Sequence, residues 1–104
     1  MTILVGLGSN LGPRRSTLET ALREIERRGV HVDARSGLYE SAPMGIPSQR
    51  PFLNAVVRVT WQDSPVELLA ALREVETVCG RRRDHPDGDR TCDLDLLLFH
   101  DRIC

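Results

Sequence analysis

The order in which strand-like and helix-like hydrophobic patterns follow one another most limits how this chain can fold. Apolar runs typical of strands cover residues 2–7, 30–39, 52–61 and roughly 91–99. Helical patterns separate the first run from the second and the third from the fourth. A proline-rich segment, which cannot form regular structure, joins the second run to the third. The chain therefore predicts the element order β-α-β-β-α-β.

The first helical pattern is an apolar stripe with the spacing of an α-helix. Leu18, Ala21, Leu22 and Ile25 recur at i, i+3, i+4 and i+7. Two arginines and then Gly29 follow the stripe. Cations stabilise a helix C-terminus and glycine accepts the left-handed conformation that often ends a helix. We therefore expect the helix to end just before Gly29.

The second helical pattern begins with a capping sequence. Ser64 suits the N-cap, Pro65 suits the first helical position, and Glu67 completes a capping box. Gly80 marks the expected end of this helix. The residues expected on its buried side are Leu68, Leu72, Val75 and Cys79.

This element order is that of an α+β, ferredoxin-like fold. Two right-handed β-α-β crossovers place both helices on the same face of a four-stranded antiparallel sheet. One face of the sheet is then covered and the other is open. Because 104 residues are enough for one hydrophobic core, we expect residues 1–104 to form a single domain.

Composition argues against several classes of partner. A net charge of -1 gives no overall field that attracts nucleic acid or anionic lipid. Two Phe, one Trp and one Tyr are few for an RNA-binding sheet of this topology. The N-terminus lacks the features of a signal peptide, and the three cysteines, which have no metal-like spacing, are interpreted as reduced thiols. We therefore expect a cytoplasmic protein that binds neither nucleic acid nor membrane.

Alternation along each strand assigns its side chains to the two faces of the sheet. The residues expected under the helices are Leu53, Ala55, Val57, Val59 and Trp61 in the third strand, and Cys92, Leu94, Leu96 and Leu98 in the fourth. The residues expected on the open face are Leu4, Gly6 and Gly8, then Phe52, Asn54, Val56, Arg58 and Thr60, and finally Asp93 and Asp95. Two acids, an amide and an aromatic ring around two glycines predict a ligand site.

Asp93 and Asp95 are the chemically most informative pair in this set. Side chains at i and i+2 on one strand face stand roughly 6–7 Å apart at Cα. A Mg²⁺ ion would relieve their repulsion, because it prefers carboxylate oxygens together with water and phosphate. A solvated strand end with Arg90 or Arg102 as counter-ion fits the spacing equally well. From spacing alone both interpretations stay open.

A set of motifs along the chain bears on whether the acid pair is a metal site or a solvated strand end. The segments "GLGSNLG", "YESAPMG", "FLNAVV", "GRRR" and "RTCDLDLLLF" occur in this order over nearly the whole chain. Together they resemble the 6-hydroxymethyl-7,8-dihydropterin pyrophosphokinases, folate-pathway enzymes that move diphosphate from ATP to a pterin alcohol and release AMP. The resemblance implies ATP and 6-hydroxymethyl-7,8-dihydropterin as substrates and two Mg²⁺ ions. It identifies no protein partner.

The resemblance also implies a role for individual residues. Asp93 and Asp95 match the metal ligands, and with Arg81 and Arg90 they form the expected catalytic set. The residues that match the ATP site are Arg73, Glu76, Arg81, Arg83 and Arg90. The residues that match the pterin site are Ser41, Ala42, Pro43, Met44, Gly45, Phe52 and Asn54. Several of these positions also fit plain structural roles: Phe52 as a core-capping ring, 41–45 as a turn, the arginine run as a solvated helix exit, and Arg73 and Glu76 as exposed helix positions.

The chain departs from the family in two places. The loop before the acidic motif is one residue shorter than usual, and Asp84, Asp87 and Asp89 add negative charge where triphosphate is expected. Family members also continue beyond the fourth strand with a segment that supplies a histidine, an arginine and a second aromatic, whereas this sequence ends at Cys104. The sequence is therefore a truncated form or a compact homologue. The alternative function is a weakly active homologue that acts as a pterin- or nucleotide-binding module.

Overall fold

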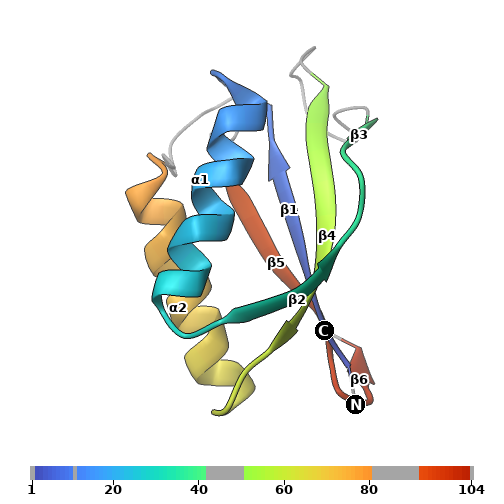
Figure 1. Cartoon of the computed structure of the whole chain (residues 1–104), viewed down its shortest axis with the longest axis vertical. Helices are drawn as coiled ribbons and strands as arrows, with labels where there is room; N and C mark the ends of the chain where they lie inside the picture. The colour runs from blue at the N-terminus through green and yellow to red at the C-terminus, as the bar shows by residue number, and fades with distance from the viewer. Residues whose placement is uncertain (1, 11, 42–50, 81–91, 104) are drawn as a thin grey trace.

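The structure is a computed structural model, and it describes residues 2–10, 12–41, 51–80 and 92–103. The elements follow one another as strands and helices in the predicted order, with two short strands added (Figure 1). Their bounds are β1 Ile3–Ser9, α1 Arg14–Arg27, β2 His31–Arg35, β3 Tyr39–Ser41, β4 Phe52–Thr60, α2 Pro65–Val78, β5 Asp93–Phe99 and β6 Arg102–Ile103.

The sheet has the strand order of a ferredoxin-like fold. Along the sheet the strands follow as β2-β4-β1-β5, and each neighbouring pair is antiparallel. Both helices lie on one face of this sheet (Figure 1). The predicted α+β fold, with one covered and one open face, is therefore confirmed.

The predicted second strand, 30–39, is two strands in the structure. Ser36 lies between β2 and β3 and exchanges hydrogen bonds with Val56 of β4: its N–H donates to the Val56 carbonyl at 2.8 Å, and its Oγ accepts from the Val56 N–H at 2.9 Å. This side-chain bond replaces a regular ladder bond, so the pairing is interrupted. β3 resumes pairing with the beginning of β4, and β6 pairs with the end of β5.

The hydrophobic core fills the space between the helices and the covered face. β1 lies at its centre and contributes Ile3, Val5 and Leu7, each at most 3% exposed. The helical stripes predicted from spacing are buried: Leu18, Ala21, Leu22 and Ile25 of α1, and Leu68, Leu72 and Val75 of α2. Neither helix is long and apolar enough to cross a membrane, within the part of the chain that the structure describes.

The last strand contains a β-bulge that the alternation rule does not foresee. Val5 pairs with Leu96 and Leu4 pairs with Leu98, so Leu97 has no partner residue on β1. The extra residue reverses the alternation beyond it. Leu98 therefore lies opposite Leu4 on the open face, and Phe99 is buried in the core in its place. The prediction that Leu98 lies under the helices is wrong for this reason.

The helix ends match the signals in the sequence. Gly29 and Gly80 both have positive φ, 86° and 82°, in the region that favours glycine. Ser64 is the N-cap of α2, and its Oγ accepts a hydrogen bond from the Glu67 N–H at 3.3 Å. Pro65 is the first residue of α2.

Ser64→Ala should lower the free energy of unfolding by about 1 kcal/mol, because an N–H of the first turn of α2 then loses its acceptor. Urea unfolding followed by circular dichroism measures the change. Val66→Ala is the matched control, since Val66 lies in the same turn and is 73% exposed. Equal destabilisation by both variants would contradict the capping role.

Candidate functional site

The open face of the sheet carries a cavity of about 290 Å³. Gly6 and Gly8 of β1 lie in its floor, and the neighbouring strands supply its walls. Five of the residues predicted to form the site line it: Ser41, Phe52, Asn54, Asp93 and Asp95. Strand alternation assigns four of them, Phe52, Asn54, Asp93 and Asp95, to this face, and the family resemblance adds Ser41; the structure brings all five to one hollow.

The sheet register places the Asn54 amide on one side of β1 and the carboxylates of Asp93 and Asp95 on the other. Asn54 lies opposite Gly8 on one side and Asp93 lies opposite Gly8 on the other. Asp95 lies opposite Gly6. Because neighbouring strands are about 4.8 Å apart, Asn54 and Asp93 are separated by roughly 10 Å at Cα. A flat ligand can lie over Gly8 between the amide and the acids.

Contacts with β3 and β4 orient the Asn54 amide. Its Nδ2 donates to Ser41 Oγ at 2.7 Å, to the Tyr39 carbonyl at 3.3 Å and to the Phe52 carbonyl at 3.4 Å. The Oδ1 atom is turned toward β1, where it lies 3.2 Å from the position that a Cβ on Gly8 would occupy. The amide group therefore presents an acceptor to the cavity, and its donor is used by the protein.

A pair of charged residues on α2 holds the backbone between the two acids. Glu76 Oε2 accepts from the Leu94 N–H at 2.8 Å, and Arg73 Nη1 donates to the Leu94 carbonyl at 3.0 Å. Arg73 and Glu76 also pair with each other at 2.6 Å. Leu94 is the residue between Asp93 and Asp95, so this clamp, formed by Arg73 and Glu76, fixes the segment that carries both carboxylates.

The clamp also covers the free edge of β5 beside Leu94. β6 pairs only with Leu98 and Phe99, so beside Leu94 the strand has no further neighbour in the described sheet. The carboxylate and the guanidinium satisfy the Leu94 peptide groups in place of a strand.

Glu76 is buried, whereas one interpretation of the sequence placed it on the exposed side of its helix. Glu76 is 2% exposed, so its description as an exposed helix position is wrong. The pKa of Arg73 is raised, first by its hydrogen bond to Glu76 and further by the nearby charges of Asp95 and Asp93. The Arg73 guanidinium is therefore positive charge within reach of the acid pair.

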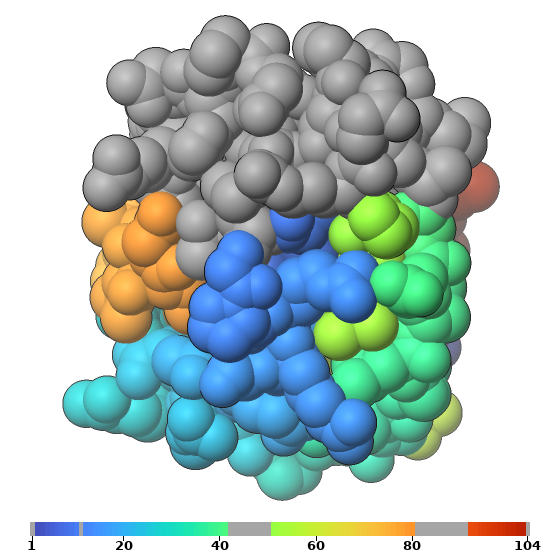
Figure 2. All heavy atoms as spheres, turned by 90° about the horizontal axis from the view of Figure 1, so that it is seen from above, coloured from blue at the N-terminus to red at the C-terminus, as the bar shows by residue number. Residues whose placement is uncertain are grey.

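Arg14 is a residue near the site that the sequence did not single out. Its Nη1 donates to Glu40 Oε2 and to the Pro51 carbonyl, both at 2.9 Å. Figure 2 shows the first turn of α1 (blue) between the end of α2 (orange) and the strands β3 and β4 (green and yellow-green). Arg14 thus ties β3 to the residue before β4.

The other predicted site residues lie outside the described residues. They are Ala42, Pro43, Met44, Gly45, Arg81, Arg83 and Arg90.

The acid pair fits a magnesium ion that shares its coordination with a ligand. Asp93 and Asp95 supply two hard carboxylate donors to one cavity. The described residues contain no cluster of three or more His, Cys, Asp or Glu side chains that would form a complete cage. Mg²⁺ commonly takes one or two carboxylates and completes its shell with water and phosphate oxygens. The donor set therefore suits a metal that arrives with a phosphorylated ligand.

The fold and the cavity define a class of protein: a ferredoxin-like α+β protein with a polar cavity on the open face of its sheet. The model of the 7,8-dihydro-6-hydroxymethylpterin-pyrophosphokinase family matches residues 4–103. The chain belongs to this family, as its motifs imply.

Curated proteins give the same result. A 2-amino-4-hydroxy-6-hydroxymethyldihydropteridine pyrophosphokinase of Haemophilus influenzae is 36% identical over 104 residues, which cover 99% of this chain and 65% of that protein. The Pseudomonas aeruginosa protein of the same name is 40% identical over 102 residues, 97% of this chain and 63% of its own length. A mitochondrial folate synthesis bifunctional protein of Pisum sativum is 38% identical over 97 residues, 93% of this chain and 19% of its own length. The chain spans less than two thirds of each relative.

Glu76→Gln should lower the free energy of unfolding by about 1–3 kcal/mol, because Arg73 and Leu94 use different oxygens of the Glu76 carboxylate, and one of these oxygens becomes an amide nitrogen that cannot accept a hydrogen bond. The Leu94 amide should also exchange its hydrogen faster than in the unmodified protein. Urea unfolding and amide exchange by NMR measure the two effects. Glu74→Gln is the control. Glu74 is exposed and lies two residues before Glu76 on α2, so this change should shift the free energy of unfolding by less than about 0.5 kcal/mol. An unchanged Leu94 exchange rate would contradict the clamp.

Proposed function

We propose that this protein transfers diphosphate from ATP to 6-hydroxymethyl-7,8-dihydropterin in folate biosynthesis, releasing AMP. The observation that carries the proposal is the position of Asn54 and Phe52 on one side of Gly8 and of the two acids on the other, in a single cavity. Such a cavity can hold a flat heterocycle next to a metal-bound triphosphate. Membership of the pyrophosphokinase family supports this assignment.

The pterin would lie on the Asn54 side of the cavity. Asn54 Oδ1 would accept from the N–H groups on the polar edge of the ring, and the Phe52 ring would stack on its face. Ser41 holds the Asn54 amide in this orientation through its 2.7 Å hydrogen bond. The family resemblance extends the pterin site over Ala42, Pro43, Met44 and Gly45.

ATP would lie on the acidic side. Asp93 and Asp95 would hold Mg²⁺, two ions by the family resemblance, which would neutralise phosphate charge as the hydroxymethyl oxygen attacks the β-phosphorus. Arg81, Arg83 and Arg90 are proposed to bind the phosphates as bidentate donors. The protein's contribution is positioning and charge compensation, without a covalent intermediate.

Arg73 and Glu76 are proposed to serve the ATP site from behind the sheet. Their hydrogen bonds to Leu94 fix the spacing of the neighbouring carboxylates. They would thus act as positioning residues for the metal ligands.

A cytoplasmic location stays a prediction from the sequence.

Asp95→Asn should reduce AMP release by on the order of a hundredfold or more, because the metal site loses a carboxylate. Coupled detection of AMP with Mg-ATP and the pterin alcohol measures turnover. Asp95 is exposed, so stability should change by less than about 0.5 kcal/mol. Asp101→Asn, an exposed change beyond β5, is the control and should keep full turnover. Undiminished turnover in Asp95→Asn would contradict the metal assignment.

The unmodified protein distinguishes the two candidate functions. If it binds both substrates without releasing AMP, the binding-module alternative is favoured.

Gly8→Ala should weaken pterin binding by on the order of tenfold, about 1.4 kcal/mol. The added Cβ would lie 3.2 Å from Asn54 Oδ1, so the amide proposed to bind the pterin must give way by a few tenths of an ångström, and it would touch Phe52 Cδ1 at 3.4 Å. Gly6→Ala is the matched control, because its Cβ meets the flexible end of Leu97, also at 3.2 Å. Calorimetric titration with the pterin compares the variants. A larger loss in Gly6→Ala than in Gly8→Ala would place the ring elsewhere.

A further inference from the structure

The strand β3 supplies part of the cavity wall on the open face, although little holds this strand in place. Its residues Tyr39 and Ser41 line the cavity. All three residues of β3 are exposed, and among the described helices and strands its backbone lies next to β4 alone. Segments with few buried apolar contacts open locally at the lowest cost in free energy. We therefore expect β3 to separate from the sheet more easily than the other strands that line the cavity.

The orientation of the Asn54 amide depends on β3. Two of the three acceptors of its Nδ2 group belong to this strand: Ser41 Oγ at 2.7 Å and the Tyr39 carbonyl at 3.3 Å. The third acceptor, the Phe52 carbonyl on β4, is the most distant at 3.4 Å. If β3 separates from β4, the amide keeps only this longest and weakest bond. It can then rotate, and Oδ1 is no longer held toward β1.

Arg14 joins β3 to β4 from the start of α1. Its Nη1 donates to Oε2 of Glu40, in the middle of β3, and to the carbonyl of Pro51, directly before β4, both at 2.9 Å. Strand alternation places the Glu40 side chain on the face opposite that of its neighbours Tyr39 and Ser41. Arg14 therefore holds the two strands together from the covered side of the sheet.

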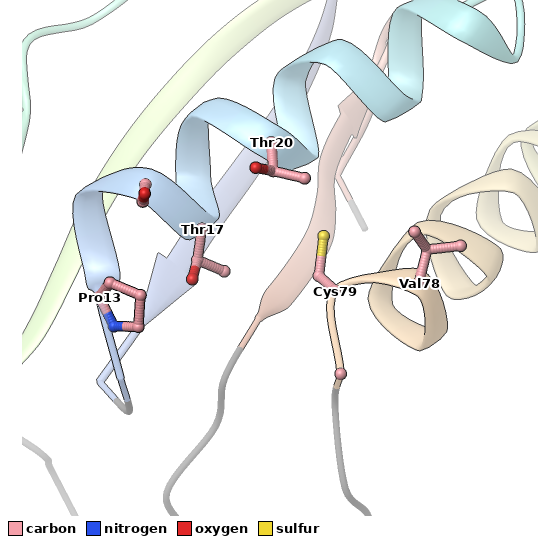
Figure 3. Close-up of a pocket in the computed structure, with 7 residues that line it drawn as sticks. Pro13, Thr17, Thr20, Val78 and Cys79 are labelled. Atoms are coloured by element: carbon pink, nitrogen blue, oxygen red, sulfur yellow. The ribbon is translucent and has the colours of Figure 1, made fainter.

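The hydrophobic core fixes the helix that carries Arg14. Leu18 and Leu22 of α1 are buried in it. Thr17 and Thr20 face a cavity of about 360 Å³ beside the end of α2 (Figure 3). Arg14 reaches from the same first turn toward β3 and β4, which lie on the other side of the helix start (Figure 2). It thus connects an exposed strand to a helix that the core holds.

Both halves of the site are then supported in the same way. On the acidic side, the clamp formed by Arg73 and Glu76 of α2 holds the Leu94 backbone between the two carboxylates. On the amide side, Arg14 of α1 holds the strands that orient Asn54. In each half, an arginine on a helix fixes, from the covered side, a segment whose side chains line the cavity.

We propose that Arg14 is a positioning residue for the pterin half of the site, where it keeps Asn54 Oδ1 directed toward the bound heterocycle. The inference rests on the proposed function for the identity of that heterocycle. Arg14 acts through β3 and Asn54, so its loss should weaken pterin binding and leave the handling of ATP unchanged. The side chains of Arg14 and Glu40 are 32% and 57% exposed, and an ion pair this exposed contributes little to overall stability.

The test replaces Arg14 with methionine, which removes both hydrogen bonds and keeps a long side chain. Arg14→Met should raise the pterin KM by on the order of tenfold, measured by AMP release, with kcat and the ATP KM within about twofold of the unmodified protein. Arg14→Lys should recover most of the pterin affinity, because one nitrogen makes both bonds and an ammonium group can also donate twice. Arg15→Met is the matched control, since Arg15 is the next residue of the same turn and is exposed.

The side-chain amide of Asn54 gives a readout that needs no ligand. Its Nδ2 protons, assigned in the NMR spectrum by their loss in Asn54→Ala, should exchange slowly with solvent because they are hydrogen-bonded to β3. Arg14→Met should speed this exchange by on the order of tenfold, since β3 then opens more often. Arg14→Lys and Arg15→Met should leave it unchanged. Circular dichroism checks folding, and Glu40→Met, which removes the acceptor on β3, serves instead if Arg14→Met does not fold.

The two measurements separate the positioning role from the proposed function. If the protein binds the pterin without releasing AMP, calorimetric dissociation constants take the place of the KM values. If it does not bind the pterin, the proposed function fails, and the exchange of the Asn54 amide still decides whether Arg14 holds that group. Unchanged exchange in Arg14→Met would overturn the proposal. An equal loss of pterin affinity in Arg15→Met, or an equal rise of the ATP KM and the pterin KM in Arg14→Met, would do the same.

Discussion

The whole arrangement depends on the division of one sheet into a covered and an open face, and β1 imposes that division. Its large side chains, Ile3, Val5 and Leu7, all point under the helices. The alternate positions Gly6 and Gly8 carry no side chain into the cavity. A strand buried on one face and bare on the other supports the core and leaves a hollow at the same residues. Fold stability and ligand access therefore do not compete for the same side chains.

The Arg73–Glu76 clamp is the second structural requirement of the site. A strand that carries two acids near its free edge has unpaired peptide groups and like charges close together. Glu76 and Arg73 satisfy the Leu94 peptide from the covered side. The arginine also brings positive charge near the acids from that side. The open side of the carboxylates stays directed toward the cavity. A polar contact beneath the sheet thus supports an acidic surface above it.

Much of this could be predicted from the sequence, because it follows from local periodicity. The helix ends at Gly29 and Gly80, the Ser64 cap and the face assignment of Asn54 and Asp95 each depend on neighbouring residues. The position of Leu98 could not, because the bulge at Leu97 depends on how β5 matches β1. The burial of Glu76 was equally hidden, since its reason is the peptide of Leu94 in a distant strand. Local patterns predicted elements and faces, whereas pairing between distant segments decided these exceptions.

Charge on the cavity determines which ligands it can accept. A triphosphate that approaches Asp93 and Asp95 meets repulsion of about 4 kcal/mol per pair of unit charges at 4 Å near a protein surface. A single guanidinium behind the sheet, that of Arg73, does not cancel two carboxylates and a triphosphate together. Binding therefore requires cations between the acids and the phosphates, with further positive charge from arginines. In the proposed reaction Mg²⁺ would thus take part in the recognition of ATP as well as in the chemistry. Without it, the acidic side of the cavity should reject the nucleotide, while the pterin side should remain able to bind.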